Sequence, residues 1–213
     1  MLSTPGSATT VPPLSGLGAA AGADAAFRDV TGLIGRSAVE FVGVNAVRPF
    51  LTATIAERAP VLVVTATGRE ADDLAAELGE ILGDSVAVFP SWETLPHERL
   101  SPGADTVGRR MQVLRRLACP DNPDYGPPLR VVVATVRSLM QPMAPNLGAV
   151  APIEFREGAE LDFDGLLERL VEFGYTRADM VGKRGEFAVR GGILDVFPPT
   201  ADHPVRVEFF GDE

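Results

Sequence analysis

The chain has 213 residues, 46% of them hydrophobic, and a formal net charge of −10 at pH 7. This length supports one large domain or two small ones, and the acidic balance argues against binding nucleic acid through bulk electrostatics. A single cysteine, Cys119, excludes an internal disulfide, and neither His97 nor His203 has metal-ligand spacing. Without a membrane-length apolar run or a secretory signal, the sequence predicts a cytoplasmic protein.

The first part of the sequence predicts alternating helices and strands after a disordered leader at 1–24, which is rich in Ala, Gly, Ser, Thr and Pro. Several short runs are apolar throughout, as in strands buried on both faces of a parallel sheet. The segments between them have apolar residues at helical spacing. In chain order we expect a short helix at 25–34, a strand at 38–42, a helix at 46–57, a strand at 61–64, a helix at 69–82, a strand at 86–89, a helix at 105–117 and a strand at 131–133.

The helix predicted at 105–117 has a defined start and one apolar face. Asp105 is suited to cap its N-terminus. The apolar face consists of Val107, Met111, Leu114 and Leu117. The arginines of this helix are expected on a solvated face, and they are Arg109, Arg110, Arg115 and Arg116.

The composition changes after Met140, where prolines and a glycine indicate a boundary. We therefore predict an α/β domain with a parallel sheet at 25–140, followed at 141–213 by an α+β domain with an antiparallel sheet. The elements expected in the second domain are a strand at 153–156, a helix at 162–173 capped by Asp162 and stopped by Gly174, a β-hairpin that turns at Gly191-Gly192, and a strand at 205–209.

The hairpin combines one apolar face with a cationic residue on the other. Phe187 and Val189 alternate with Ala188 and Arg190 before the glycine pair. Further cations nearby in the sequence are Arg177, Lys183 and Arg184. A guanidinium on a rigid strand suits docking to carboxylates. The alternative interpretation is an ordinary solvated strand face.

Three sequence blocks resemble known repair proteins. The stretch from Tyr175 to Pro198 is similar to a hairpin signature shared by UvrB and the bacterial transcription-repair coupling factors (Mfd). The block from Ser91 to Pro96, with Leu100-Ser101-Pro102 and Asp105, is similar to one typical of coupling factors and not of UvrB. Val205 to Glu213 is similar to the strand that follows the hairpin in both. The sequence thus resembles the N-terminal, UvrB-like region of coupling factors.

This resemblance implies a degenerate RecA-like lobe that has lost its phosphate loop. Comparison with UvrB places that loop at Gly43-Val44-Asn45-Ala46-Val47, where only Gly43 is kept. Ala46 stands in place of the lysine that neutralises phosphate, and Val47 in place of the hydroxyl that ligates magnesium. The resemblance therefore implies no catalytic residue and no cofactor in this chain. The DNA-gripping hairpin of UvrB is also missing, because Pro102 to Asp105 leads directly into a helix.

The resemblance also implies a role in nucleotide excision repair. Coupling factors displace stalled RNA polymerase from double-stranded DNA with a motor that uses ATP and magnesium, and they recruit UvrA. The motor and the polymerase-binding modules lie outside this chain, so the region is expected to be a non-catalytic UvrA-recruiting module. Arg177 and Arg190 match the family's UvrA-contacting arginines, with Lys183 and Arg184 as supporting cations. Ala188 replaces a further arginine of UvrB.

Two alternatives stay open at this point. The first is a UvrB-type helicase lobe that binds ATP. The second is an autoinhibitory lobe that packs on the C-terminal domains of the same protein, a contact that the resemblance also implies. In the family the second domain continues beyond Glu213, so the resemblance implies a truncated sheet.

Overall fold

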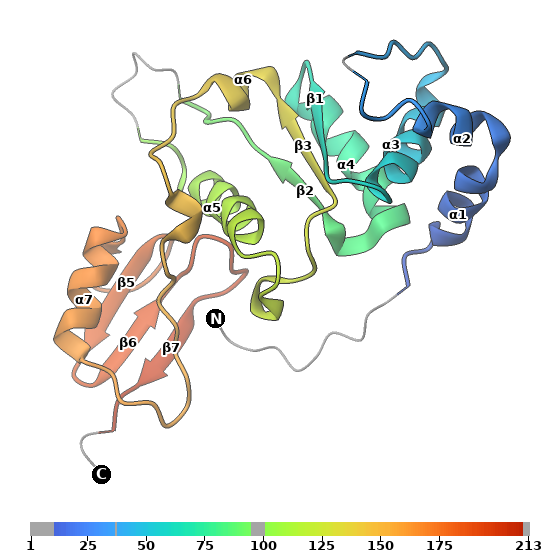
Figure 1. The fold of residues 1–213 in the computed structure, drawn as a ribbon. Coiled ribbons are helices and arrows are strands. Elements are labelled where there is room, and N and C mark those ends of the chain that lie inside the picture. Colours follow the sequence, from blue (N-terminus) through green and yellow to red (C-terminus); the bar gives the residue numbers. More distant parts are fainter. Residues whose placement is uncertain (1–10, 37, 95–100, 211–213) are drawn as a thin grey trace. The chain divides into compact units, whose positions relative to one another are not determined.

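The computed structural model describes residues 11–36, 38–94 and 101–210 (Figure 1). The chain divides into two compact units. The first unit contains Pro5–Ser91 and Gln112–Val150, and the second contains Trp92–Met111 and Ala151–Glu213. The units are thus interleaved in sequence, unlike the continuous domains predicted at 25–140 and 141–213.

The first unit is built on a three-stranded parallel sheet with the order β1-β3-β2. Its strands are β1 (Val61–Thr65), β2 (Val86–Phe89) and β3 (Val131–Thr135). The central strand β3 pairs with both neighbours, and Val131 lies in register with Val61 and Val86. The strand–helix–strand alternation and the predicted α/β class are confirmed.

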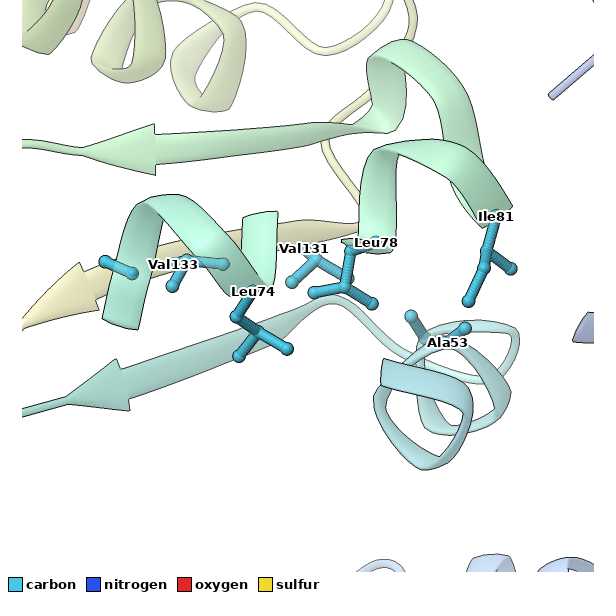
Figure 2. Packing of buried hydrophobic residues seen from close by; sticks show 8 residues of the cluster. Ala53, Leu74, Leu78, Ile81, Val131 and Val133 are labelled. Atoms are coloured by element: carbon cyan, nitrogen blue, oxygen red, sulfur yellow. The ribbon is translucent and has the colours of Figure 1, made fainter. Parts of the chain in front are cut away.

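The core of this unit lies between the sheet and two helices, α3 (Arg48–Ala56) and α4 (Gly68–Leu82) (Figure 2). Thr67 caps α4 by accepting a hydrogen bond from the Glu70 amide at 3.2 Å. The buried residues of α4 recur every three or four positions and pack on the central strand together with Ala53. They are Ala71, Leu74, Leu78 and Ile81. Spacing in the sequence therefore predicted both the helix and its buried face.

Two helices stand where the sequence predicted a disordered leader or a single short helix. They are α1 (Ser15–Ala23) and α2 (Ala25–Thr31). The Leu14 amide donates to the carbonyl of Glu80 at 2.8 Å, and a Cβ on Gly18 would lie 2.6 Å from Cγ2 of Ile81. The Ala- and Gly-rich segment is thus helical because it docks on α4, a tertiary contact that composition alone does not reveal.

Two strand predictions in this unit are wrong in part. No strand forms at 38–42 among the residues described there. In β1, Val61 and Val63 face the core, but Leu62 and Val64 are exposed. The strand lies at an edge of the sheet and only one of its faces is covered, so its apolar run did not indicate burial on both sides.

Several short helices and the longer helix α5 occur before, between and after the strands of the first unit in the sequence. They are the 3₁₀ segments η1 (Asn45–Val47), η2 (Gly83–Ser85), η3 (Pro123–Tyr125) and η4 (Leu147–Ala149), and the α-helices α5 (Ala104–Ala118) and α6 (Val136–Met140). Thr135 and Ser138 form a reciprocal capping box at the start of α6. Pro49 lies in the first turn of α3, where a proline costs no intrahelical hydrogen bond.

The N-terminal half of α5 belongs to the second unit and differs from its prediction. Asp105 lies inside the helix and is not its cap. Arg110, expected in solvent, is only 1% exposed, and its guanidinium lies 4.1 Å from the centroid of the Trp92 ring. Glu93 accepts hydrogen bonds from the Thr106 hydroxyl and the Gly103 amide. The buried face is thus set by contacts with residues 92 and 93, which lie too far away in sequence to enter a helical periodicity.

The second unit also contains a four-stranded sheet with the order β4-β5-β6-β7. Its strands are β4 (Thr176–Arg177), β5 (Glu186–Arg190), β6 (Ile193–Val196) and β7 (Val205–Glu208), and α7 (Phe163–Glu172) precedes them. Only β4 and β5 are parallel, and the other pairs are antiparallel. The predicted strand at 153–156 is absent, although Ile153 and Phe155 pack against the core.

Gly108 allows α5 to approach the loop after β6 closely. A Cβ at this position would lie 2.4 Å from Cβ of Pro199 and 3.1 Å from Cγ2 of Thr200. We expect Gly108→Ala to lower the free energy of unfolding by about 1–3 kcal/mol in urea denaturation, because the helix must move away from the loop. Gly79→Ala is the matched control, since a Cβ on this glycine of α4 would meet nothing within 4 Å. It should raise stability by about 0.5–1 kcal/mol, and equal losses for both variants would contradict the close approach.

Candidate partner-binding surface

The β5–β6 hairpin is the rigid base of the candidate surface. Arg190 pairs with Ile193 across a two-residue turn, in which Gly191 has a φ of 60°. On the inner face, Phe187, Leu194 and Val196 are buried against Leu166 and Leu170 of α7. Asp162 caps that helix by accepting from the Gly165 amide. The predicted hairpin and capped helix are confirmed.

The outer face of the same sheet has paired charges at its centre. Ala188, Asp195 and Arg206 lie opposite one another on β5, β6 and β7. Arg206 donates from Nε to Oδ1 of Asp195 at 2.7 Å and from Nη2 to Oδ2 at 2.9 Å. This hydrogen bonding holds the pKa of Asp195 below its ordinary value, and the positive charge of Arg190 adds to the effect.

The two arginines singled out in the sequence are both exposed but differ in their internal contacts. Arg190 donates from Nη2 to the backbone carbonyl of Asp179 at 3.2 Å. Arg177 lies on β4, in register with Phe187, and its guanidinium has no hydrogen bond or ion pair with any other residue that the structure describes. Asp179 follows Arg177 by two positions, so the Arg190 side chain reaches back towards the segment that begins at Arg177.

The supporting cations, Lys183 and Arg184, lie in the loop between β4 and β5, and they differ in their contacts with other described residues. Arg184 donates to the carbonyl of Ala201 at 3.0 Å and pairs with Asp202 at 3.7 Å. Its guanidinium also lies over the ring of Phe197. The Lys183 side chain is exposed, while its backbone amide donates to the carboxylate of Glu186. Arg184 is thus tied to its own unit, whereas the ammonium group of Lys183 has no hydrogen bond or ion pair with any residue in the described part of the chain, and its charge helps to lower the pKa of Glu186.

Comparison with known proteins gives the family. A family model described as the UvrB interaction domain matches residues 153–213. The transcription-repair-coupling factor of Mycobacterium bovis is 56% identical over 214 residues, which cover 100% of this chain and 17% of the relative. The chain belongs to the transcription-repair coupling factor family. The coupling factor of Escherichia coli is 33% identical over 167 residues, or 76% of this chain and 14% of the relative.

The likeness to UvrB is shorter than the likeness to coupling factors. The UvrABC system protein B of Agathobacter rectalis is 44% identical over 84 residues, which cover 39% of this chain and 13% of that protein. The UvrB-like character predicted from the hairpin is therefore confirmed. This chain spans 17% of the length of the two mycobacterial coupling factors that it matches at 56% identity. Within the described residues, none of its helices is long and apolar enough to cross a membrane.

In this coupling-factor region, the segment at the position of the phosphate loop leads into α3. Asn45, Ala46 and Val47 form η1, and Gly43 precedes it in irregular structure. The nearest cation in sequence, Arg48, pairs with Glu70 at 2.6 Å and lowers the pKa of that carboxyl. Arg48 is therefore engaged by an internal carboxylate. The expected absence of nucleotide binding stays a prediction.

Glu186 is a residue of this surface that sequence reasoning missed. Its Oε2 accepts hydrogen bonds from the amides of Gly182 and Lys183, both at 2.9 Å. These two bonds hold the pKa of the Glu186 carboxyl below its ordinary value. The available signal in the sequence was that Glu186 follows Lys183 by three positions and Gly182 by four. This spacing is common in sequences that do not form the contact, so it does not predict it.

Proposed function

We propose that this coupling-factor region recruits UvrA through the candidate surface at the β4 edge of the sheet, which exposes Arg177 on the face of Phe187 and Arg190 on the opposite face. The observation that carries the proposal is the state of Arg177, which is exposed and has no internal partner among the described residues. A guanidinium supplies a planar fork of donors that fits carboxylates, and the Arg177 backbone pairs with Phe187, which belongs to the buried core. The UvrB interaction domain match supports UvrA as the partner.

The parent protein, in this proposal, is an ATP-dependent translocase that displaces stalled RNA polymerase from double-stranded DNA. ATP and magnesium would bind its C-terminal motor, outside this chain. The region described here has Ala46 and Val47 where a phosphate loop needs a lysine and a hydroxyl, so we assign it binding and no catalysis. Saturable binding of a fluorescent ATP analogue to this chain would instead favour a nucleotide-binding lobe.

Arg177→Ala tests the proposal most cleanly, because Arg190→Ala would also remove the hydrogen bond to Asp179. We expect calorimetric titration with purified UvrA to show that the binding free energy is weaker by about 2–5 kcal/mol. This is the cost of removing one partner of a desolvated charge pair. Arg156→Ala is the matched control in the same unit, since Arg156 is exposed and pairs with Glu154. The control should change binding by less than about 0.5 kcal/mol. An equally small change for Arg177→Ala would refute the assignment.

The same surface can also serve an intramolecular contact with the C-terminal domains of the parent. Exposed cations do not distinguish two acidic partners that use one surface. If both contacts exist, UvrA and the C-terminal part compete for this chain. Arg177→Ala should then weaken both interactions, and simultaneous binding of both partners would argue against a shared surface.

A further inference from the structure

We infer that the loop of residues 178–185 is a preformed contact element of this surface, with Met180 as its apolar anchor and Glu186 as the residue that positions the loop. The inference rests on the proposed function and adds a specific contact to it. The partner surface that fits is a shallow apolar depression on UvrA bordered by carboxylates.

The loop is held at both ends and near its middle by the strands that flank it. The Ala178 amide donates to the carbonyl of Phe187, and the Thr176 amide to the carbonyl of Gly185, both at 2.9 Å. Gly185 has a φ of 83° and donates to the carbonyl of Phe197 at 2.8 Å. Arg190 binds the carbonyl of Asp179. A loop fixed in this way loses little conformational entropy when a partner binds.

Glu186 fixes the part of the loop that carries Lys183. A single carboxylate oxygen accepts from two successive amides, those of Gly182 and Lys183. The Glu186 amide in turn donates to the carbonyl of Lys183 at 3.2 Å. One oxygen of the Glu186 carboxylate is therefore engaged within the loop. Glu186 acts as a positioning residue.

Met180 is the apolar feature of this loop. Its side chain is 74% exposed, although the neighbouring backbone is tied down. The segment from Arg177 to Arg190 carries four cations and two carboxylates, and one of those carboxylates belongs to Glu186. Methionine and arginine are enriched in the cores of protein interfaces, whereas lysine and glutamate are depleted there. An exposed methionine among arginines, on a loop with a fixed backbone, thus fits a docking anchor that enters an apolar depression while the arginines meet carboxylates at its border.

The direct test is Met180→Ser in the full chain, titrated with purified UvrA. We expect binding to weaken about tenfold, as for an anchor residue at an interface, with no change in the urea midpoint. Met140→Ser is the matched control, because Met140 is 79% exposed and belongs to the first unit. It should leave binding unchanged. If Met180→Ser changes binding less than twofold while Arg177→Ala weakens it, the anchor is refuted and UvrA recruitment stands. If the unaltered chain does not bind UvrA, the proposed function itself fails.

Glu186 requires a readout that reports the loop and not only the fold. In Glu186→Ala, we expect faster hydrogen exchange at the Gly182 and Lys183 amides, unchanged exchange at Leu194, and weaker UvrA binding. Glu186→Gln keeps an accepting oxygen and should restore most of the amide protection and of the affinity. Faster exchange at these two amides with unchanged affinity for UvrA would refute the positioning role.

Discussion

Replacing Phe187 with alanine is expected to lower the free energy of unfolding of the second unit by about 3–5 kcal/mol. The Phe187 side chain is 1% exposed and packs in one cluster with Leu166, Leu170 and Leu194. Its removal leaves a cavity under β5, the strand that carries Arg190. Since whole domains are stable by only about 5–15 kcal/mol, the variant should also lose UvrA binding although no charged group is altered.

The single tryptophan of the chain provides the measurement, because Trp92 belongs to the second unit. Urea denaturation followed by Trp92 fluorescence should show a lower midpoint for Phe187→Ala. Phe210→Ala makes the same change at a residue that is 79% exposed, and it should cost less than about 1 kcal/mol. Equal midpoints for the two variants would mean that Phe187 does not support this core.

Replacing Leu78 with alanine is expected to lower the free energy of unfolding of the first unit by about 2–5 kcal/mol. Leu78 is fully buried on α4 and packs with Val131, Val133 and Ala53 (Figure 2). The helix and the central strand lose their shared contact when the side chain is shortened. The spread of the expected values reflects how far the neighbouring residues can close the cavity.

Leu117→Ala is the control for this prediction, since Leu117 is also helical but half exposed. It should cost less than about 1 kcal/mol. Hydrogen exchange at the β3 amides reports the first unit and should accelerate only in Leu78→Ala. Similar acceleration in both variants would show that burial on α4 does not determine the stability of this sheet.

The elements with a local signal were predictable from the sequence. The buried face of α4 follows from apolar residues every three or four positions, and the hairpin follows from alternation around two glycines. The predictions that were wrong for Arg110 and for α1 share a different cause. Arg110 is buried by Trp92, and α1 is fixed by Glu80 and Ile81, so distant contacts decided both. The exposed face of β1 shows the converse, because an apolar run does not ensure a covering layer.

The cationic residues of the candidate surface were proposed from the sequence, and their contacts came only from the structure. Its two arginines came from the resemblance of the hairpin to UvrB and to coupling factors. That Arg184 is tied to Asp202 while Arg177 has no partner among the described residues depends on side-chain directions, which a sequence pattern does not contain. The role of Glu186 likewise depends on the path of the loop before β5.

The interleaving of the two units limits how the proposed UvrA-recruiting module can be transplanted. A cassette cut at Ile153, where the family-model match begins, would carry the hairpin and α7 but not Trp92–Met111. Pro199 and Thr200 would then lose their contact with α5, which packs against them at Gly108. Apolar surface would become exposed to solvent. A chimaeric protein that is meant to capture UvrA therefore needs both segments, joined by a linker in place of residues 112–150.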